Sequence, residues 1–262
     1  MHIEIIDAQN KGRNYNYLIA CSETKEAVAV DPIAVDACLA IAHQRGWKIT
    51  HIVNTHEHID HTGGNEAMRC ATGAKLCAHY LAPIENVDIK LRGDHSLQIG
   101  NTVKFEVLDT PGHTLSHICL FAYDLDDVPH LFTGDMLFNA GCGNCLHGGD
   151  VDKLYESFSE QFERLPDETH IYPGHDYIDN NLRFAQSVEP HNPHIKGLQD
   201  KLLTHPRPYV SNLHMERLVN PFFREDSNEI EATLRAKGFE LPLEQVRRKD
   251  IFLALRALRN QW

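Results

Sequence analysis

Short runs of apolar residues, many alternating with polar ones, fill about the first 175 positions of the chain and predict β-strands. These runs are IEII, YNYLIA, AVAVDP, KITHIVNTH, KLCAHY, SLQIG, VKFEVLDTPGHT, HICLFAY, HLFTGDML and THIYPGHDYI, which we predict to be the final strand. Between them, VDACLAIAHQRG and GGNEAMRCATG carry apolar residues at helical spacing. DVDKLYESFSEQFERLP predicts an amphipathic helix that Asp150 caps and Pro166 ends. Predicted strands with helices between them indicate a mixed α/β body.

The pattern becomes almost entirely helical from about Asn180 onward. The predicted helices are NNLRFAQSVE, HIKGLQDKLL, SNEIEATLRAKG and PLEQVRRKDIFLALRAL. We therefore divide the chain into an α/β domain over residues 1–178 and a helical domain over residues 179–262. A length of 262 residues suits one large domain with a smaller companion.

Charge and composition limit the classes of binding partner that we expect for this protein. A formal net charge of −12 argues against nucleic acid, because phosphate binding needs a surplus of Lys and Arg. No run reaches the roughly 18 apolar residues of a membrane span, so we expect no membrane partner. The N-terminus lacks the charged start and continuous apolar stretch of a signal peptide, so we expect a cytoplasmic protein.

The 7 cysteines are scattered along the chain, which is not the pattern of a secreted disulfide framework. Cys142 and Cys145 stand in the C-x-x-C spacing of CGNC. No helical pattern follows them directly, as it would in a thioredoxin-like site, so loop packing is favoured over a working thiol pair. The sequence leaves open whether these two thiols are redox-active.

The segment NTHEHIDHTGGN gathers candidate metal ligands at His56, His58, Asp60 and His61. A helical zinc-protease motif, H-E-x-x-H, would need His at position 60, where this chain has Asp. At the end of a strand, His56 and His58 would point the same way, whereas Asp60 and His61 follow the turn and aim elsewhere. Such a segment is too crowded for one tetrahedral centre, which indicates two neighbouring metals.

Further ligands are expected where later strands end beside glycines: His113 in TPGHT, Asp135 in FTGDM and His175 in YPGHD. Asp135 is the natural bridge, because a carboxylate has two oxygens. Two metals about 3.5–4 Å apart would hold a hydroxide and polarise a carbonyl. Imidazole and carboxylate ligands suit zinc, but also iron and manganese. Lone histidines are usually surface or core residues, but the repeated local context argues against coincidence here.

Four segments resemble the successive motifs of the metallo-β-lactamase superfamily: THEHIDHTGG, TPGHT, TGDM and PGHDY. Within that superfamily, three segments are most similar to glyoxalase II, the hydroxyacylglutathione hydrolases: DMLFNAGCG, GHDYIDNNLRFA and NPFFR. The resemblance implies an αββα sandwich that forms the catalytic domain and a C-terminal helical domain that binds substrate. It also implies the metal ligands, with Asp60 and Asp135 as catalytic carboxylates. One metal would take His56, His58 and His113, the other would take Asp60, His61 and His175, and Asp135 would bridge them.

The same resemblance implies that Tyr177 contacts glutathione and that Asp31 makes structural hydrogen bonds near the site. The match weakens where a substrate would bind. After GCG the family usually has a basic residue and then, two positions later, an aromatic one, where this chain has Asn144 and Leu146. The arginine of a family motif Arg-x-x-Lys-Asp falls on Val246. We predict Tyr177, Asn144, Arg247 and Lys249 as substrate-binding residues, although a solvated helix face also explains RRKD.

The resemblance implies a metal-dependent hydrolase of a small glutathione-linked thioester, S-D-lactoylglutathione or a related acylglutathione, in which a metal-bridging hydroxide attacks the carbonyl. One alternative is the same chemistry on a different thioester or ester, given Asn144, Leu146 and Val246. Another is a persulfide dioxygenase with one iron, which the helical tail disfavours. A nuclease is disfavoured by the acidic balance, and a structural zinc site by its need to close with four ligands.

Overall fold

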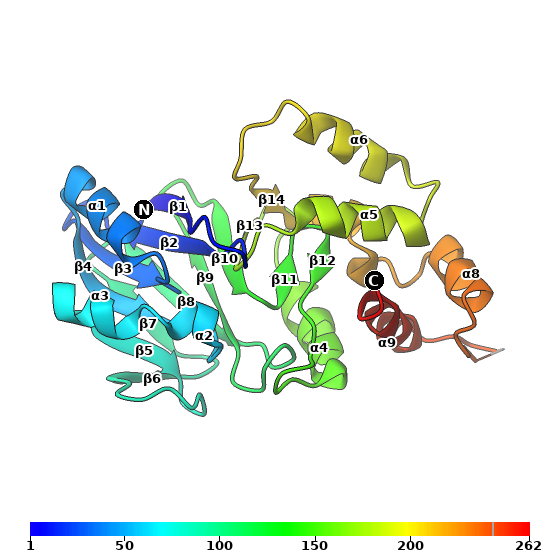
Figure 1. Cartoon of the computed structure of the whole chain (residues 1–262), viewed down its shortest axis with the longest axis horizontal. Helices are drawn as coiled ribbons and strands as arrows, with labels where there is room; N and C mark the ends of the chain where they lie inside the picture. Colours follow the sequence, from blue (N-terminus) through cyan, green and yellow to red (C-terminus); the bar gives the residue numbers. More distant parts are fainter. Residues whose placement is uncertain (243) are drawn as a thin grey trace.

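The computed structural model describes residues 1–242 and 244–262, which form two six-stranded sheets packed face to face (Figure 1). The first sheet has, in order, β1 (His2–Asp7), β2 (Tyr15–Ala20), β3 (Glu26–Val30), β4 (Lys48–Val53), β5 (Lys75–His79) and β6 (Ile89–Leu91). The second has β14 (Ser211–Asn212), β13 (His170–Pro173), β10 (Pro129–Gly134), β9 (Ile118–Tyr123), β8 (Val103–Asp109) and β7 (Ser96–Ile99). From β3 to β6 the strands are parallel, and in the second sheet β10 and β13 are parallel.

Every second side chain along the strands points into the space between the two sheets and helps to fill it. In β2, Tyr17 and Ile19 face this space, and Leu18 faces the opposite side of the sheet. In β8, Phe105 and Val107 close the space from the second sheet. A period of two places successive side chains on opposite faces, so one strand supplies both the central core and an outer one.

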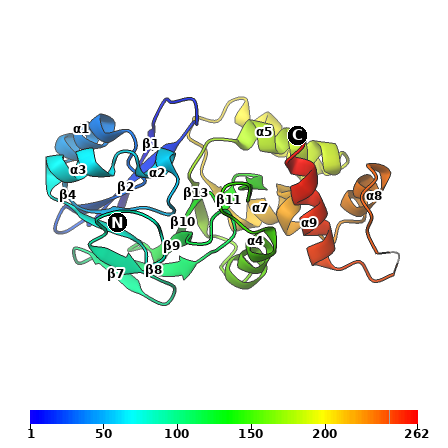
Figure 2. The same cartoon turned by 60° about the horizontal axis from the view of Figure 1, so that its bottom comes forward.

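Helices cover the outer faces, which confirms the predicted αββα sandwich (Figures 1 and 2). On the first sheet lie α1 (Val35–Arg45) and α3 (Asn65–Thr72), which pack through Ala42 and Met68. On the second lies α4 (Val151–Ser157), which continues as the π-helical turn η1 (Phe158–Phe162). Asp150 caps α4, as predicted, because its side chain accepts hydrogen bonds from the N–H groups of Asp152 and Lys153.

The last third of the chain is helical, as predicted, and gathers at the end of the molecule away from α1 and α3 (Figure 1). Its elements are α5 (Ile178–Val188), α6 (Pro193–Leu202), α7 (Leu213–Val219), the 3-10 turn η2 (Pro221–Phe223), α8 (Asn228–Ala236) and α9 (Arg248–Arg259). Phe184 of α5 and Phe252 of α9 join the outer core of the second sheet, so these helices pack directly against the sandwich.

Two expectations about this region were wrong. The helix expected over PLEQVRRKDIFLALRAL begins at Arg248, because the carboxylate of Asp250 accepts the N–H of Arg247 at 3.1 Å and fixes the helix start there; Leu243 of that expectation lies outside the described residues. A further strand, β14, follows THIYPGHDYI and pairs with β13. Its two residues are too few to show a periodicity.

Loops at one edge of the sandwich carry the candidate ligands. They follow the ends of β4, β8, β10 and β13, and the edge also includes α2 (Ile59–Thr62) and the small hairpin of β11 (Leu137–Phe138) and β12 (Gly141–Cys142). No helix among the described residues is long and apolar enough to span a bilayer.

Candidate metal centre

The loop after β4 brings the first candidate ligands together, although not by strand alternation. β4 ends at Val53, so His56 and His58 lie in the loop and not on a strand as expected. They nevertheless converge, with His56 Nε2 and His58 Nδ1 3.1 Å apart. His58 precedes α2, and Asp60 and His61 lie in the first turn of that helix. Asp60 and His61 form a second group with His175, but they do not simply diverge from the first pair, because the ring centroids of His56 and His61 are 4.1 Å apart.

One group of possible ligands consists of His56, His58 and His113, whose nitrogens all lie within 4.8 Å of one another. His113 Nε2 is 3.0 Å from His58 Nδ1. A tetrahedral zinc ion with ligands at about 2.0–2.1 Å would separate its ligand atoms by about 3.3 Å. The spacing of these nitrogens therefore suits a common cation.

A second group consists of Asp60, His61 and His175. His61 Nε2 and His175 Nε2 are 3.2 Å apart, and Asp60 Oδ2 is 3.6 Å from the former and 3.5 Å from the latter. His61 and His175 are buried, whereas the side chain of Asp60 is 43% exposed. This second group therefore has one side open to solvent.

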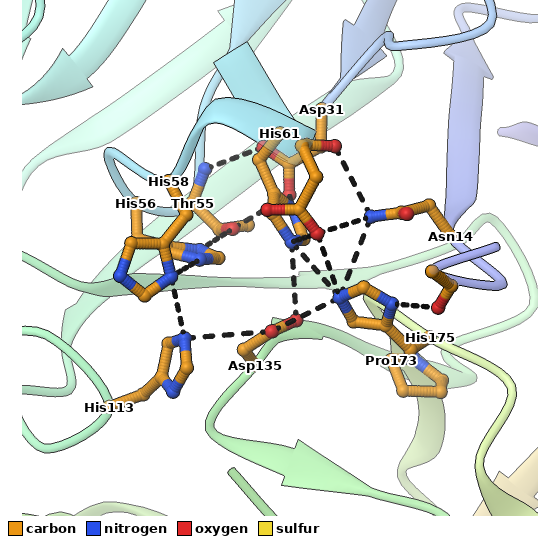
Figure 3. Close-up of polar contacts among 12 residues, drawn as sticks. Asn14, Asp31, Thr55, His56, His58, His61, His113, Asp135, Pro173 and His175 are labelled. Atoms are coloured by element: carbon orange, nitrogen blue, oxygen red, sulfur yellow. Dashed lines mark hydrogen bonds and ion pairs between the residues drawn. The ribbon is translucent and has the colours of Figure 1, made fainter. Parts of the chain in front are cut away.

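Asp135 lies between the two groups (Figure 3). Its Oδ2 is 3.5 Å from His113 Nε2 and 3.2 Å from His175 Nε2, and its Oδ1 is 3.5 Å from His61 Nε2. Oδ1 is buried and has no hydrogen-bond partner among the described residues. A buried carboxylate oxygen without a donor is costly, and a cation at this position would satisfy it. The residues present therefore fit a pair of divalent cations that share Asp135.

Hydrogen bonds fix the orientation of all five histidine rings from outside. His61 Nδ1 contacts Asp31 Oδ2 at 2.9 Å, and Asp31 also accepts the N–H and hydroxyl of Thr55, which confirms its structural role. Nδ1 of His113 donates to the carbonyl of Asn144 at 2.6 Å, and Nδ1 of His175 to that of Gly12 at 2.6 Å.

The rings of His56 and His58 are also held by hydrogen bonds on the side that faces away from the cluster. His56 Nδ1 lies 3.0 Å from Thr55 Oγ1, and His58 Nε2 lies 3.0 Å from the carbonyl of His147. Since Thr55 Oγ1 donates to Asp31, it accepts from His56. In every ring the outer nitrogen is held by an acceptor, which leaves the inner nitrogen with a lone pair directed at the cluster.

Burial and charge act against each other on the pKa values of the cluster. Burial would raise the pKa of Asp135, but His175 and His61 hold it well below its usual value. Burial lowers the pKa of His56 well below its usual value and lowers that of His113. Burial also disfavours the charge of His61, but Asp135 and Asp31 raise its pKa well above its usual value. The site thus keeps a buried carboxylate ionised, and because Asp135 and Asp31 favour the protonated form of His61, a cation that binds there would displace a proton.

Two supporting residues were not assigned from the sequence. The buried Nε2 of His117 accepts the backbone N–H of Asp135 at 3.2 Å. Asn14, in the turn between β1 and β2, donates from Nδ2 to Asp60 Oδ2 at 3.1 Å. The sequence signal for Asn14 was weak, because asparagine is common in turns for conformational reasons alone.

A cavity of about 240 Å³ is lined by Tyr177 and Asn144, each of which contacts a histidine of the cluster. The ring of Tyr177 stacks on that of His175, with centroids 4.8 Å apart and planes 7° apart. Arg256 and Arg259 of α9, which sequence reasoning missed, also line this cavity.

Arg247 and Lys249 are not among the residues that line the cavity. Arg247 Nη2 pairs with Asp250 Oδ1 at 2.8 Å and its side chain is 75% exposed. Lys249 Nζ pairs with Asp152 Oδ1 at 2.6 Å, across the contact between α9 and α4. Their assignment as substrate-binding residues stays a prediction.

The thiols of Cys142 and Cys145 are free. Burial raises the pKa of both, that of Cys145 to about 12, so both are protonated at neutral pH. Cys142 is buried at the end of the β11–β12 hairpin, where Arg256 Nη1 contacts its Sγ at 3.5 Å. This environment agrees with the packing role favoured from the sequence.

Comparisons with known proteins agree with this geometry. Residues 21–175 match the family model described as Metallo-beta-lactamase superfamily, and residues 176–262 match Hydroxyacylglutathione hydrolase C-terminus. Hydroxyacylglutathione hydrolases from a Polaromonas species and from Nitrosococcus oceani are 49% and 48% identical to this chain, each over 100% of both proteins. The crystal structure of ETHE1 from Myxococcus xanthus is similar with a TM-score of 0.69 at 27% identity, covering 99% of this chain and 98% of that one. This chain therefore belongs to the hydroxyacylglutathione hydrolase family within the metallo-β-lactamase superfamily.

Proposed function

We propose that this chain hydrolyses thioesters of glutathione, with S-D-lactoylglutathione as a substrate, at a site for two divalent cations. The relatives that align over the whole chain are named hydroxyacylglutathione hydrolases. The observation that carries the proposal is the position of Asp135. Its two buried oxygens approach histidines of both groups, and one of these oxygens lacks a donor among the described residues.

Each cation has its own set of protein ligands in this proposal. His56, His58 and His113 hold one cation, Asp60, His61 and His175 hold the other, and Asp135 bridges the two. We propose zinc, which suits imidazole and carboxylate ligands, as do iron and manganese. When bound, two divalent cations acidify a water molecule and polarise the carbonyl oxygen of a thioester.

The protein's own residues supply orientation and charge. Asp31, Asn144 and Gly12 hold rings of the cluster in one tautomer. Asp135 and Asp60 are the proposed catalytic carboxylates, and Asn14 holds Asp60 at the half-open side of the site. A thiolate leaves readily from a thioester, so a strong general acid is not required.

We assign a different proposed role to each of the two domains. Residues 1–178 form the catalytic domain, and residues 179–262 form the helical domain that contributes to substrate binding. Tyr177, at the boundary, and Asn144 bind the thiol part of the substrate in this proposal. Both line the cavity, and each contacts a histidine of the cluster.

A hydrolase with a different thioester or ester substrate is the second candidate. The observation that favours it is the pair Asn144 and Leu146, where the family usually has a basic and an aromatic residue; both line the cavity. A persulfide dioxygenase with one iron is less well supported, because the described residues offer ligands on both sides of Asp135.

A turnover assay on purified protein, with metal content measured on the same sample, tests the proposal. We expect hydrolysis of S-D-lactoylglutathione and two metal ions per chain. Good activity on another thioester without lactoylglutathione turnover would replace the substrate. One iron per chain together with oxygen consumption would replace the reaction class.

A further inference from the structure

The cavity beside the cluster touches neighbours of both metal-binding groups. Tyr177 stacks on His175 of one group, and the carbonyl of Asn144 binds His113 of the other. The remaining wall includes Arg256 and Arg259 from α9. A molecule that reacts at the cluster and extends into this cavity would therefore meet the end of α9.

Two arginines here lack a carboxylate partner among the residues that the structure describes, although the chain has 37 acidic residues against 25 basic ones. Neither Arg256 nor Arg259 forms an ion pair among the described residues, and neither is exposed. The other arginines without an ion pair in that part of the chain are exposed: Arg92, Arg164 and Arg183. Two partly or fully buried cations side by side are unfavourable unless an anion joins them.

The two guanidinium groups differ in how many of their donors are used. Arg256 binds the carbonyls of Cys142 and Gly143 through Nη1, and Asn260 Oδ1 through Nε and Nη2. The guanidinium of Arg259 makes a single hydrogen bond within the described chain, from Nη2 to Asn181 Oδ1 at 3.2 Å. Its guanidinium stacks over the ring of Phe184 at 5.3 Å, which restricts its plane. Arg259 therefore keeps free donors beside the cavity, and Arg256 adds charge.

We infer that Arg259 binds a carboxylate of the thiol part of the substrate and so determines specificity for an anionic thiol such as glutathione. This inference rests on the proposed function. It also accounts for two departures in sequence, since Asn144 and Val246 stand at positions where the family usually has cations. In this chain the cation comes from the last turn of α9. A planar guanidinium suits this task, because it can hold a carboxylate through two parallel hydrogen bonds.

A binding titration tests the inference without catalysis. The zinc-loaded protein is titrated by calorimetry with S-methylglutathione, which cannot be hydrolysed, and with its dimethyl ester, which lacks both carboxylates. We expect Arg259→Gln to weaken S-methylglutathione binding by about tenfold or more and to leave diester binding unchanged. Arg259→Lys should recover part of the loss. Arg183→Gln, which removes an exposed charge elsewhere in the helical domain, should bind as wild type does.

Unchanged S-methylglutathione affinity in Arg259→Gln, or an equal loss for the diester, would overturn the inference. So would a wild-type protein that does not bind S-methylglutathione at all. Steady-state kinetics separate this failure from that of the proposed function. If wild type hydrolyses S-D-lactoylglutathione, Arg259→Gln should raise KM with little change in kcat. If wild type binds S-methylglutathione through Arg259 but does not hydrolyse the thioester, the proposed function fails and the anion site stands.

Discussion

The backbone carbonyl of Asn144 accepts the Nδ1–H of His113 at 2.6 Å, so a loop, and not a side chain, orients this histidine. Arg256 holds that loop from the other side, because its Nη1 donates to the carbonyls of Cys142 at 3.0 Å and Gly143 at 3.1 Å. The C-terminal helix is thereby connected to the group of His56, His58 and His113 through two hydrogen-bonded steps.

Replacing Arg256 should therefore weaken one cation more than the other. In Arg256→Met the side chain keeps its bulk, but the carbonyls of Cys142 and Gly143 lose their donor. We expect about a 10- to 100-fold loss of affinity for the cation held by His113, the effect typical of residues that support a metal ligand. Competition with a chelator, followed by metal analysis, measures it. Arg183→Gln is the control, and equal retention of both metals by Arg256→Met would contradict this coupling.

Asp135 and His175 should differ in how their loss affects the two metals. Asp135→Asn should weaken both together, because the carboxylate approaches histidines of both groups. His175→Ala should mainly remove the cation shared with Asp60 and His61. Metal stoichiometry during stepwise chelation distinguishes the two variants. An equal loss of both metals in each variant would refute the bridging assignment.

The sequence predicts this centre well because its ligands repeat one local context. His113, Asp135 and His175 each follow an apolar run and stand beside a glycine, and the structure brings all three to the edge where His56 and His61 lie. The sandwich was predicted from the resemblance of these motifs to the metallo-β-lactamase superfamily, whereas the apolar pattern alone indicated only a mixed α/β body. Where a local pattern carries the information, sequence reasoning succeeds.

The wall of the cavity has no such local signal. Arg256 and Arg259 look like ordinary basic residues in the last turn of an amphipathic helix, and only the packing of α9 on the sandwich brings them to the cavity. The family motif favoured Lys249, which fits its lysine, and Arg247, which lies next to its arginine position, but both residues lie at the start of α9. The start of a helix fixes which way each of its residues points, and this start depends here on the contact of Asp250 with Arg247.

Two glycines offer a matched pair of substitutions. A Cβ added at Gly174 would overlap Asp135 Oδ1 and lie 2.9 Å from His61 Cε1, whereas one added at Gly197 would meet nothing within 4 Å. Gly174→Ala should therefore displace the bridging carboxylate and lower the affinity for both metals. Gly197→Ala, inside α6, should leave metal binding unchanged and stabilise the fold by about 0.5–1 kcal/mol. Chelator competition and denaturant unfolding measure the two effects, and normal metal affinity in Gly174→Ala would refute the tight packing at Asp135.

A buried glutamate beneath the hairpin of β11 and β12 should make stability depend on pH. Glu216 is fully buried and accepts hydrogen bonds from the N–H of Ala140 at 2.8 Å, Ser211 Oγ at 2.7 Å and Asn220 Nδ2 at 2.9 Å. Burial outweighs these donors and raises the pKa of Glu216 from 4.5 to about 7. The folded protein therefore binds this proton more tightly than the unfolded chain does.

The sign of the effect follows from linkage. The stabilisation is fully present below about pH 4.5 and is lost as the pH rises through about 7. Glu216→Gln cannot lose a proton. As the pH rises across this range, its free energy of unfolding should therefore increase relative to that of wild type, by about 3 kcal/mol in total. Urea unfolding of both zinc-loaded proteins at each pH measures the difference, in which the pH dependence of metal binding cancels. A difference that stays constant from pH 4.5 to pH 8 would mean that the pKa of Glu216 is the same in the folded and unfolded states, and would contradict the raised pKa.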